Sequence, residues 1–162
     1  MKFSDVKGRQ VVTLDGADKI GYIGSAYISD NGANIIGFEV DMRGLLAGHR
    51  VFTWDHLSSI GADAVTIPDE EALHEQTRSA LANALSTSDV IGAKVMAERG
   101  DDLGSVGDIE FDDGSGAITG YILSPSLMER IEGHRETFAP SAIQSVSASM
   151  LVVADGAVQR ES

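Results

Sequence analysis

The sequence predicts a mainly β protein built from two tandem small β-barrels joined by one amphipathic helix. Three observations support this fold class. The stretch from Ile23 to Phe38 is repeated, with similar residues, from Val106 to Tyr121. Within each copy apolar residues alternate with polar ones, as they do in half-buried strands. The chain has 18 glycines and only 3 prolines in 162 residues, which favours many turns over long helices.

The repeat runs through most of the chain at an offset of about 84 residues. Asp5-Val6 matches Asp89-Val90, Gly37-Phe38 matches Gly120-Tyr121, and Gly48-His49-Arg50 matches Gly133-His134-Arg135. The offset changes only within loops, so the two copies are expected to share one architecture. We predict one barrel at residues 1–68, another at residues 87–158 and a short tail at residues 159–162.

The alternation within the first copy identifies its strands. Ala26 and Ile28 share one face of the first repeated strand. Ile36, Phe38 and Val40 share one face of the next strand. The SDNGAN sequence between the two strands predicts a hairpin turn, because Asn-Gly tolerates the positive φ of tight turns. Further strands are expected at Val11–Leu14, Arg50–Trp54 and Ala64–Ile67. Short strands with apolar faces avoid open edges by closing into a barrel.

Residues 69–86 between the copies predict the linker helix. Asp69, Glu70 and Glu71 follow Pro68, and acidic side chains in a first turn interact favourably with the helix dipole. Apolar residues at helical spacing continue to Leu85. We expect the helix to pack against one or both barrels, the alternative being a free helix that binds a partner.

The motifs in this order resemble the PRC-barrel family. Both copies begin with an apolar-x-Gly-x-x-Val segment, at Val6–Val11 and Val90–Val95, and both contain an apolar-x-Gly-aromatic segment that ends at Phe38 and Tyr121. The second copy has the fuller Leu103–Asp112 motif, whereas the first has Ser25 where Asp108 stands. Related barrels occur in the cytoplasmic domain of the photosynthetic reaction-centre H subunit and in a small-subunit ribosome maturation factor. The resemblance implies an adaptor that docks proteins, without shared catalytic residues.

Composition limits the partners and the compartment. The formal net charge is −13, which opposes binding to nucleic-acid phosphates and to anionic membrane surfaces. There is no cysteine, so disulfides and thiolate metal sites are excluded. No apolar run approaches the roughly 18 residues of a membrane-spanning helix, and the first residues lack a signal-peptide pattern. We expect a cytoplasmic protein, either free or attached to a membrane-bound partner.

Catalytic and metal-binding motifs are not recognisable in the sequence. The four histidines form no cluster with zinc-ligand spacing, and the acidic turn at Asp112 and Asp113 does not follow the EF-hand pattern. Glu39, Asp41 and Asp108 could form paired carboxylates, but nothing in the sequence requires this. We therefore expect no enzyme, no metal and no cofactor.

Apolar residues in loops are the candidate partner-binding residues. They are Leu45 and Leu46 in the first copy and Leu127, Met128 and Ile131 in the second, together with Trp54. Such residues either fold back over a barrel end or form a partner surface. Trp54, the single tryptophan, is expected either to pack in the core or to anchor a partner.

The leading hypothesis is a non-enzymatic protein-interaction or scaffold module, acting on another protein or as a homodimer. The alternative is a ribosome-assembly or RNA-processing adaptor that works through protein contacts, because the charge is unsuitable for RNA. A weaker alternative is small-molecule binding at the seam between the barrels.

Overall fold

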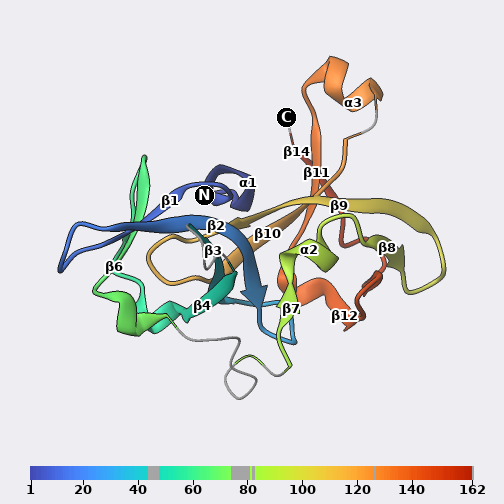
Figure 1. Ribbon diagram of the computed structural model, residues 1–162. Coiled ribbons are helices and arrows are strands. Elements are labelled where there is room, and N and C mark those ends of the chain that lie inside the picture. Colours follow the sequence, from blue (N-terminus) through green and yellow to red (C-terminus); the bar gives the residue numbers. More distant parts are fainter. Residues whose placement is uncertain (44–47, 74–80, 82, 126, 162) are drawn as a thin grey trace.

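The computed structural model describes residues 1–43, 48–73, 81, 83–125 and 127–161, and it confirms the mainly β class. Strands form two seven-stranded sheets, and the longest helix among the described residues has six residues. Figure 1 shows the first half of the chain in blue to green and the second half in yellow to red. None of the described helices has the length and apolar character needed to cross a membrane.

The first sheet has the strand order β4-β3-β2-β1-β6-β5, with β7 paired to β2. Its strands are β1 (Gln10–Thr13), β2 (Lys19–Ile28), β3 (Ile35–Met42), β4 (His49–Thr53), β5 (Ser59–Ile60), β6 (Ala64–Ile67) and β7 (Leu85–Ser86). Neighbouring strands are antiparallel except β1 and β6, which are parallel.

The second sheet has the order β12-β13-β8-β9-β10-β11-β14. Its strands are β8 (Lys94–Ala97), β9 (Asp102–Phe111), β10 (Ile118–Leu123), β11 (Arg135–Phe138), β12 (Ile143–Val146), β13 (Met150–Val153) and β14 (Gln159–Glu161). The pair β8 and β13 is parallel, like β1 and β6. Apart from β7 and β14, the two sheets therefore have the same order and the same single parallel pair.

Neither sheet is a closed barrel, which corrects the expectation from the sequence. Within the described part of the chain, β4 and β5 end the main path of the first sheet, and no strand pairing joins them. The 3-10 turn η1 (Trp54–His56) stands between them, and the two residues of β5 pair with β6. In the second half, η3 (Pro140–Ala142) lies in the same way between β11 and β12. In each half a helical turn thus separates, along the chain, the two strands whose pairing would have closed the sheet.

The two halves exchange their first segments. Helix α1 (Phe3–Val6) begins the first half, yet it packs beside β9 of the second. The preceding residues extend β9, because the Phe111 amide donates to the Met1 carbonyl at 2.8 Å and Lys2 forms a bridge with Glu110. The segment before the second half does the reverse. Strand β7 pairs with the end of β2, and α2 (Thr87–Val90) packs beside β2.

The repeated hairpins meet at the centre of the exchange. The amide of Ile35 donates to the carbonyl of Gly116 at 2.7 Å, and the amide of Ile118 donates to the carbonyl of Ala33 at 2.9 Å. Ile35 and Ile118 are equivalent in the two copies, as are Ala33 and Gly116. The two hydrogen bonds are thus related by a local pseudo-twofold symmetry, and backbone pairing joins the halves directly.

A single hydrophobic core results from this exchange. Phe3, from the first half, is 2% exposed and belongs to the same buried cluster as Phe111 and Leu151 of the second half. Val6 and Val90 hold equivalent places in the exchanged helices and are both buried. A unit of about 70 residues alone is only marginally stable, so a shared core favours folding of the halves together.

The predicted linker helix from Asp69 to Leu85 is wrong as a continuous helix. Asp69 caps only a 3-10 turn, η2 (Glu70–Ala72), and Leu73 is extended, with φ −83° and ψ 133°. Leu85 is in strand β7. Of the apolar stripe, Thr77 and Ala80 lie outside the described residues. An extended exit from η2 and the pairing of β7 with β2 leave no room for one helix across the whole segment.

Two further expectations differ from the structure. Ile36 was expected on the face of Phe38, but Ile35 is the buried residue, since Tyr27 pairs with Gly37 and Ile28 with Ile35. Ile36 is therefore the extra residue of a β-bulge, which shifts the alternation by one position. The predicted tail also contains a strand, because β14 pairs with β11.

Candidate functional site

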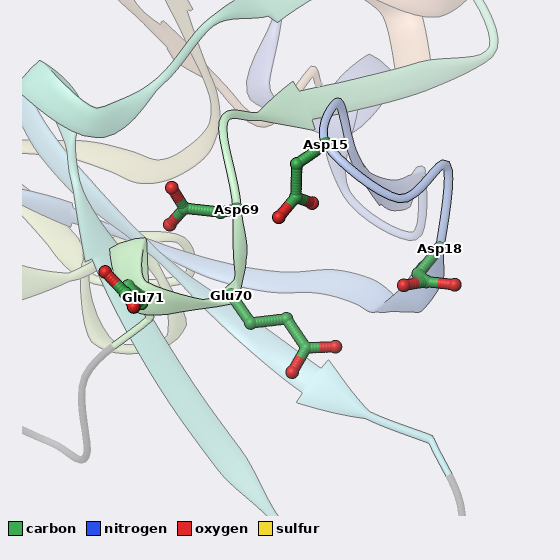
Figure 2. A pocket seen from close by; sticks show the side chains of 5 residues that line it. All are labelled: Asp15, Asp18, Asp69, Glu70 and Glu71. Atoms are coloured by element: carbon green, nitrogen blue, oxygen red, sulfur yellow. The ribbon is translucent and has the colours of Figure 1, made fainter.

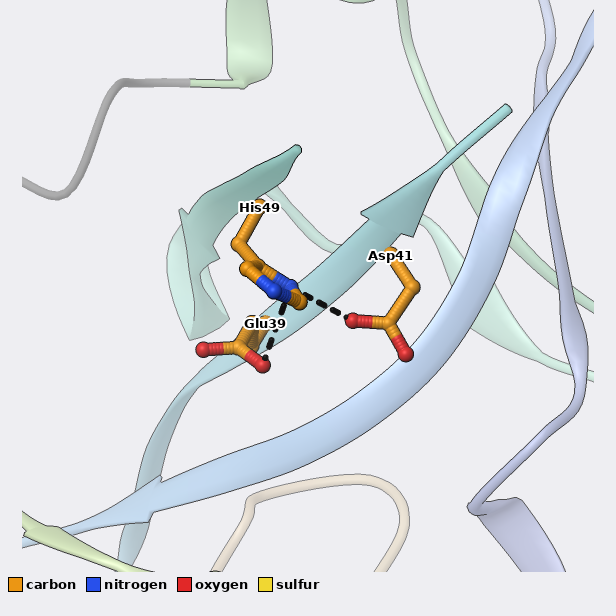
Figure 3. A group of neighbouring side chains, drawn as sticks. All are labelled: Glu39, Asp41 and His49. Atoms are coloured by element: carbon orange, nitrogen blue, oxygen red, sulfur yellow. Dashed lines mark hydrogen bonds and ion pairs between the residues drawn. The ribbon is translucent and has the colours of Figure 1, made fainter. Parts of the chain in front are cut away.

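Glu39, Asp41 and His49 form a compact polar cluster on the first sheet (Figure 3). Glu39 and Asp41 are two residues apart on β3 and therefore share a face, while His49 begins β4 directly opposite Asp41. The Nδ1 of His49 lies 2.7 Å from Oδ1 of Asp41 and 3.5 Å from Oε1 of Glu39. Two carboxylates and one imidazole thus converge on one point.

Neighbouring residues of β2 hold this cluster in place. The hydroxyl of Tyr27 donates to Oε2 of Glu39 at 3.3 Å. Burial, reinforced by the Glu39 carboxylate, raises the pKa of Tyr27, so its hydroxyl remains a donor. Gly24 lies beneath Asp41, and a Cβ there would approach Oδ1 of Asp41 to 2.8 Å. Glycine therefore gives the Asp41 carboxylate the space that it occupies.

The sequence alone does not predict this cluster. Glu39 and Asp41 are evident there only as carboxylates, and the repeat pairs His49 with His134. In the strand register, Phe38 pairs with Phe52 and its counterpart Tyr121 pairs with Phe138. This register makes Arg135 the counterpart of His49, one position from His134. The spacing of two carboxylates in a strand, followed by a histidine at the start of the next, was the available signal.

A second group of side chains is purely acidic. Figure 2 shows Asp15, Asp18, Asp69, Glu70 and Glu71 around a pocket of about 370 Å³. Two of them come from the β1–β2 connection and three from the segment that follows β6. The carboxylate of Asp69 also accepts a hydrogen bond from the amide of Ala72 at 3.2 Å, so it caps η2. This surface repels anionic ligands such as phosphates.

The seam between the halves contains the third candidate. Trp54 lies at the contact, with ring centroids 5.9 Å from Phe38 and 6.3 Å from Phe111. A Cβ on Gly116 would lie 3.0 Å from the Trp54 ring, so the indole rests against that glycine. On the other side of the pseudo-twofold axis, Pro140 stands in the place of Trp54. A pocket of about 510 Å³ is found there, and its lining residues are Asn31, Ala33, Ile118, Pro140, Ser141 and Ile143.

The residues predicted to bind a partner have different environments. Leu45 and Leu46 lie outside the described residues, and so do the side chains of Leu127 and Met128, whose backbone is in α3 (Leu127–Glu132). Ile131, also in α3, is 73% exposed. Trp54 packs against the shared core within the chain. Trp54 thus belongs to the core contact between the halves, whereas Ile131 is exposed to solvent.

Helix α3 stands apart from the two sheets (Figure 1). It joins β10 to β11, and the outer edge of β11 is covered by β14. Arg135 ties these strands together, because its guanidinium contacts Glu161 at 2.8 Å and Glu110 at 3.4 Å. The hydrogen bond with Glu161 raises the pKa of Arg135. The arm formed by β10, α3 and β11 is thus held at its base by strand pairing and ion pairs.

A family model for the PRC-barrel domain matches residues 82–159. The matched range contains α2 and the strands from β8 to β13. This match confirms, for the second half of the chain, the resemblance to the PRC-barrel family. Within the PRC-barrel domain, the glycines and apolar residues of the motifs serve turns and core. The N-terminal half repeats the strand order of the PRC-barrel domain. A search of curated proteins finds no match to the chain.

Proposed function

We propose that the chain is a non-enzymatic protein-interaction module and that α3 is its main partner surface. The observation that carries this proposal is the 73% exposure of Ile131 on a helix that projects from the sheets (Figure 1). Covering such a side chain with another protein removes apolar surface from water, which favours association. The PRC-barrel domain is of a kind used for protein interactions, which supports the same conclusion.

The charge of the chain favours a protein partner over nucleic acid, because a net charge of −13 opposes binding to phosphates. We also propose that the protein acts in the cytoplasm. The partner is another protein or a second copy of the chain. A ribosome-assembly adaptor would use the same arm, and the identity of the captured protein distinguishes it from a scaffold of another kind.

The test compares Ile131→Asp with Leu14→Asp, since Leu14 is also apolar and 61% exposed but lies on the body of the first half. Tagged forms of both variants are used to isolate partners from the native host, and light scattering measures self-association. We expect Ile131→Asp to lose the partner or the dimer and Leu14→Asp to keep it. Equal behaviour of the two variants and the parent chain would refute the assignment to α3.

The seam pocket supports a second candidate, the binding of a small molecule. Its lining combines apolar side chains with the polar groups of Asn31 and Ser141. A ligand would raise the melting temperature of the parent chain and leave that of Ser141→Trp unchanged, because the indole would occupy the pocket. An equal rise in both proteins would place the ligand elsewhere.

A further inference from the structure

We propose that Glu39, Asp41 and His49 form a binding site for one divalent first-row transition-metal ion. The proposal is independent of the interaction function and concerns the other half of the chain. It rests on the donor atoms, on their separations, on the residues that orient them and on a comparison with the second half.

The separations of the donor atoms suit a single ion. An ion about 2.1 Å from each ligand atom keeps neighbouring ligand atoms roughly 3.0–3.4 Å apart. The two measured distances from Nδ1 of His49 are 2.7 Å and 3.5 Å, on either side of that range. All three donor atoms lie within 4.8 Å of one another. The two distances from His49 therefore need to change by only a few tenths of an ångström to reach that range.

The donor set decides the class of ion. Calcium and magnesium prefer oxygen ligands alone, whereas imidazole suits zinc, cobalt, nickel, iron and copper. One imidazole and two carboxylates, presented by two adjacent strands, match in number the three-ligand sites that leave further positions to water. The side chains of Asp41 and His49 are about half exposed, at 49% and 58%, so water has access to those positions.

The surrounding residues orient the ligands as outer-shell groups do in metal sites. Tyr27 fixes one oxygen of Glu39 and leaves Oε1 directed toward His49. Gly24 allows the Asp41 carboxylate to lie over β2. Figure 3 shows both carboxylates and the imidazole directed toward one another from β3 and β4. A bound ion would join β4 to β3 at the end of the sheet.

The second half shows that the fold itself does not require this cluster. At the equivalent register, Glu39, Asp41 and His49 are replaced by Ile122, Ser124 and Arg135. There, the guanidinium of Arg135 forms ion pairs with Glu110 and Glu161. The PRC-barrel domain thus builds the same strands without a metal-ligand set, and the cluster is specific to the N-terminal half.

The experiment titrates Zn²⁺ and Mg²⁺ into chelator-treated full-length protein by calorimetry, with Co²⁺ absorption as a report on coordination. The Glu39→Gln/Asp41→Asn double variant removes two carboxylates of the cluster. The control is Asp15→Asn/Asp69→Asn, which changes the net charge equally but alters the acidic pocket. His49→Ala and Tyr27→Phe complete the set, and melting curves in chelator check that each variant is folded.

We expect one Zn²⁺ per parent chain, bound at least about tenfold more tightly than Mg²⁺, as the imidazole ligand requires. His49→Ala and the cluster double variant should each weaken Zn²⁺ binding more than about tenfold, and Tyr27→Phe by about tenfold. The acidic-pocket control should keep the affinity of the parent chain. Equal weakening in the control, equal affinity for Mg²⁺ or the lack of a saturable site would overturn the proposal, because each would indicate general attraction of cations to an acidic surface.

Discussion

Replacing Phe3 with alanine tests whether the two halves fold as one unit. Phe3 is 2% exposed in the shared core, and its helix packs beside β9 of the other half. Truncation of a buried phenylalanine costs about 3–5 kcal/mol, because burial is lost and a cavity remains. In a chain of this size each kcal/mol lowers the melting temperature by roughly 2–4 °C, so a decrease of about 6–20 °C is expected.

Urea unfolding followed by circular dichroism and by tryptophan fluorescence measures the effect. Trp54 contacts Phe38 in one half and Phe111 in the other, so its emission reports on the seam. We expect both signals to shift together to lower urea. Leu14→Ala, at a position 61% exposed, should change the free energy of unfolding by less than about 0.5 kcal/mol. A loss below about 1 kcal/mol for Phe3→Ala, or two separate transitions, would refute the single core.

Two further predictions concern the seam and one surface ion pair. Gly116 and Gly133 both have positive φ, +81° and +75°, but a Cβ on Gly116 would lie 2.8 Å from the Ile35 carbonyl, whereas one on Gly133 meets nothing within 4 Å. Gly133→Ala should therefore lower the free energy of unfolding in urea by only about 1–2 kcal/mol, through backbone strain. Gly116→Ala should lower it clearly more, and equal decreases would contradict the close approach. The pKa of the Asp102 carboxyl is lowered first by the hydrogen bond from Lys94 and then by the hydrogen bond from the Gly104 amide. The pair's stabilisation is thus present at neutral pH and fades as pH falls through the lowered pKa. Lys94→Ala should raise the Asp102 pKa toward its ordinary value in an NMR titration, and an unchanged value would contradict this cause.

Local patterns in the sequence predicted the fold class and the repeat, because strand alternation and Asn-Gly turns are properties of adjacent residues. Pairings between distant segments were harder to predict from the sequence. The same period fits a closed barrel and a curled open sheet, since closure depends on whether β4 reaches β5. The bulge at Ile36 adds one residue to β3, so Ile35 is buried where the alternation predicted Ile36. The composition of the strand does not reveal such a bulge.

The exchange of α1 and α2 between the halves could not be predicted from the sequence either. The repeat shows that Val6 and Val90 are equivalent and apolar, but it does not say which half buries each of them. A helix that packs on its own strands and one that packs on the other copy have the same pattern. The linker was misjudged for a related reason, since β7 gains its hydrogen bonds from β2 and not from helical neighbours.

Prediction of the candidate sites from the sequence depended on the strand register to different degrees. Ile131 could be proposed as an exposed apolar residue from the sequence, and its partner remains a prediction. The cluster of Glu39, Asp41 and His49 could not be assembled, because it requires the β3–β4 register that places His49 opposite Asp41. A sequence comparison that pairs the Gly-His-Arg segments instead assigns His49 to His134, one residue from the structural counterpart.

The pseudo-twofold symmetry separates what the fold needs from what is particular to one half. The exchanged helices, the parallel strand pair and the hairpin contact occur in both halves, so folding accounts for them. Differences at equivalent positions need another explanation. Trp54 fills one side of the seam where Pro140 leaves a pocket on the other. The cluster of Glu39, Asp41 and His49 is replaced by Ile122, Ser124 and Arg135 in the second half. Because equivalent strands form without Glu39, Asp41 and His49, whereas Trp54 packs against the core, substitutions in the cluster should alter binding more than folding. The cluster is therefore where function can be separated from stability.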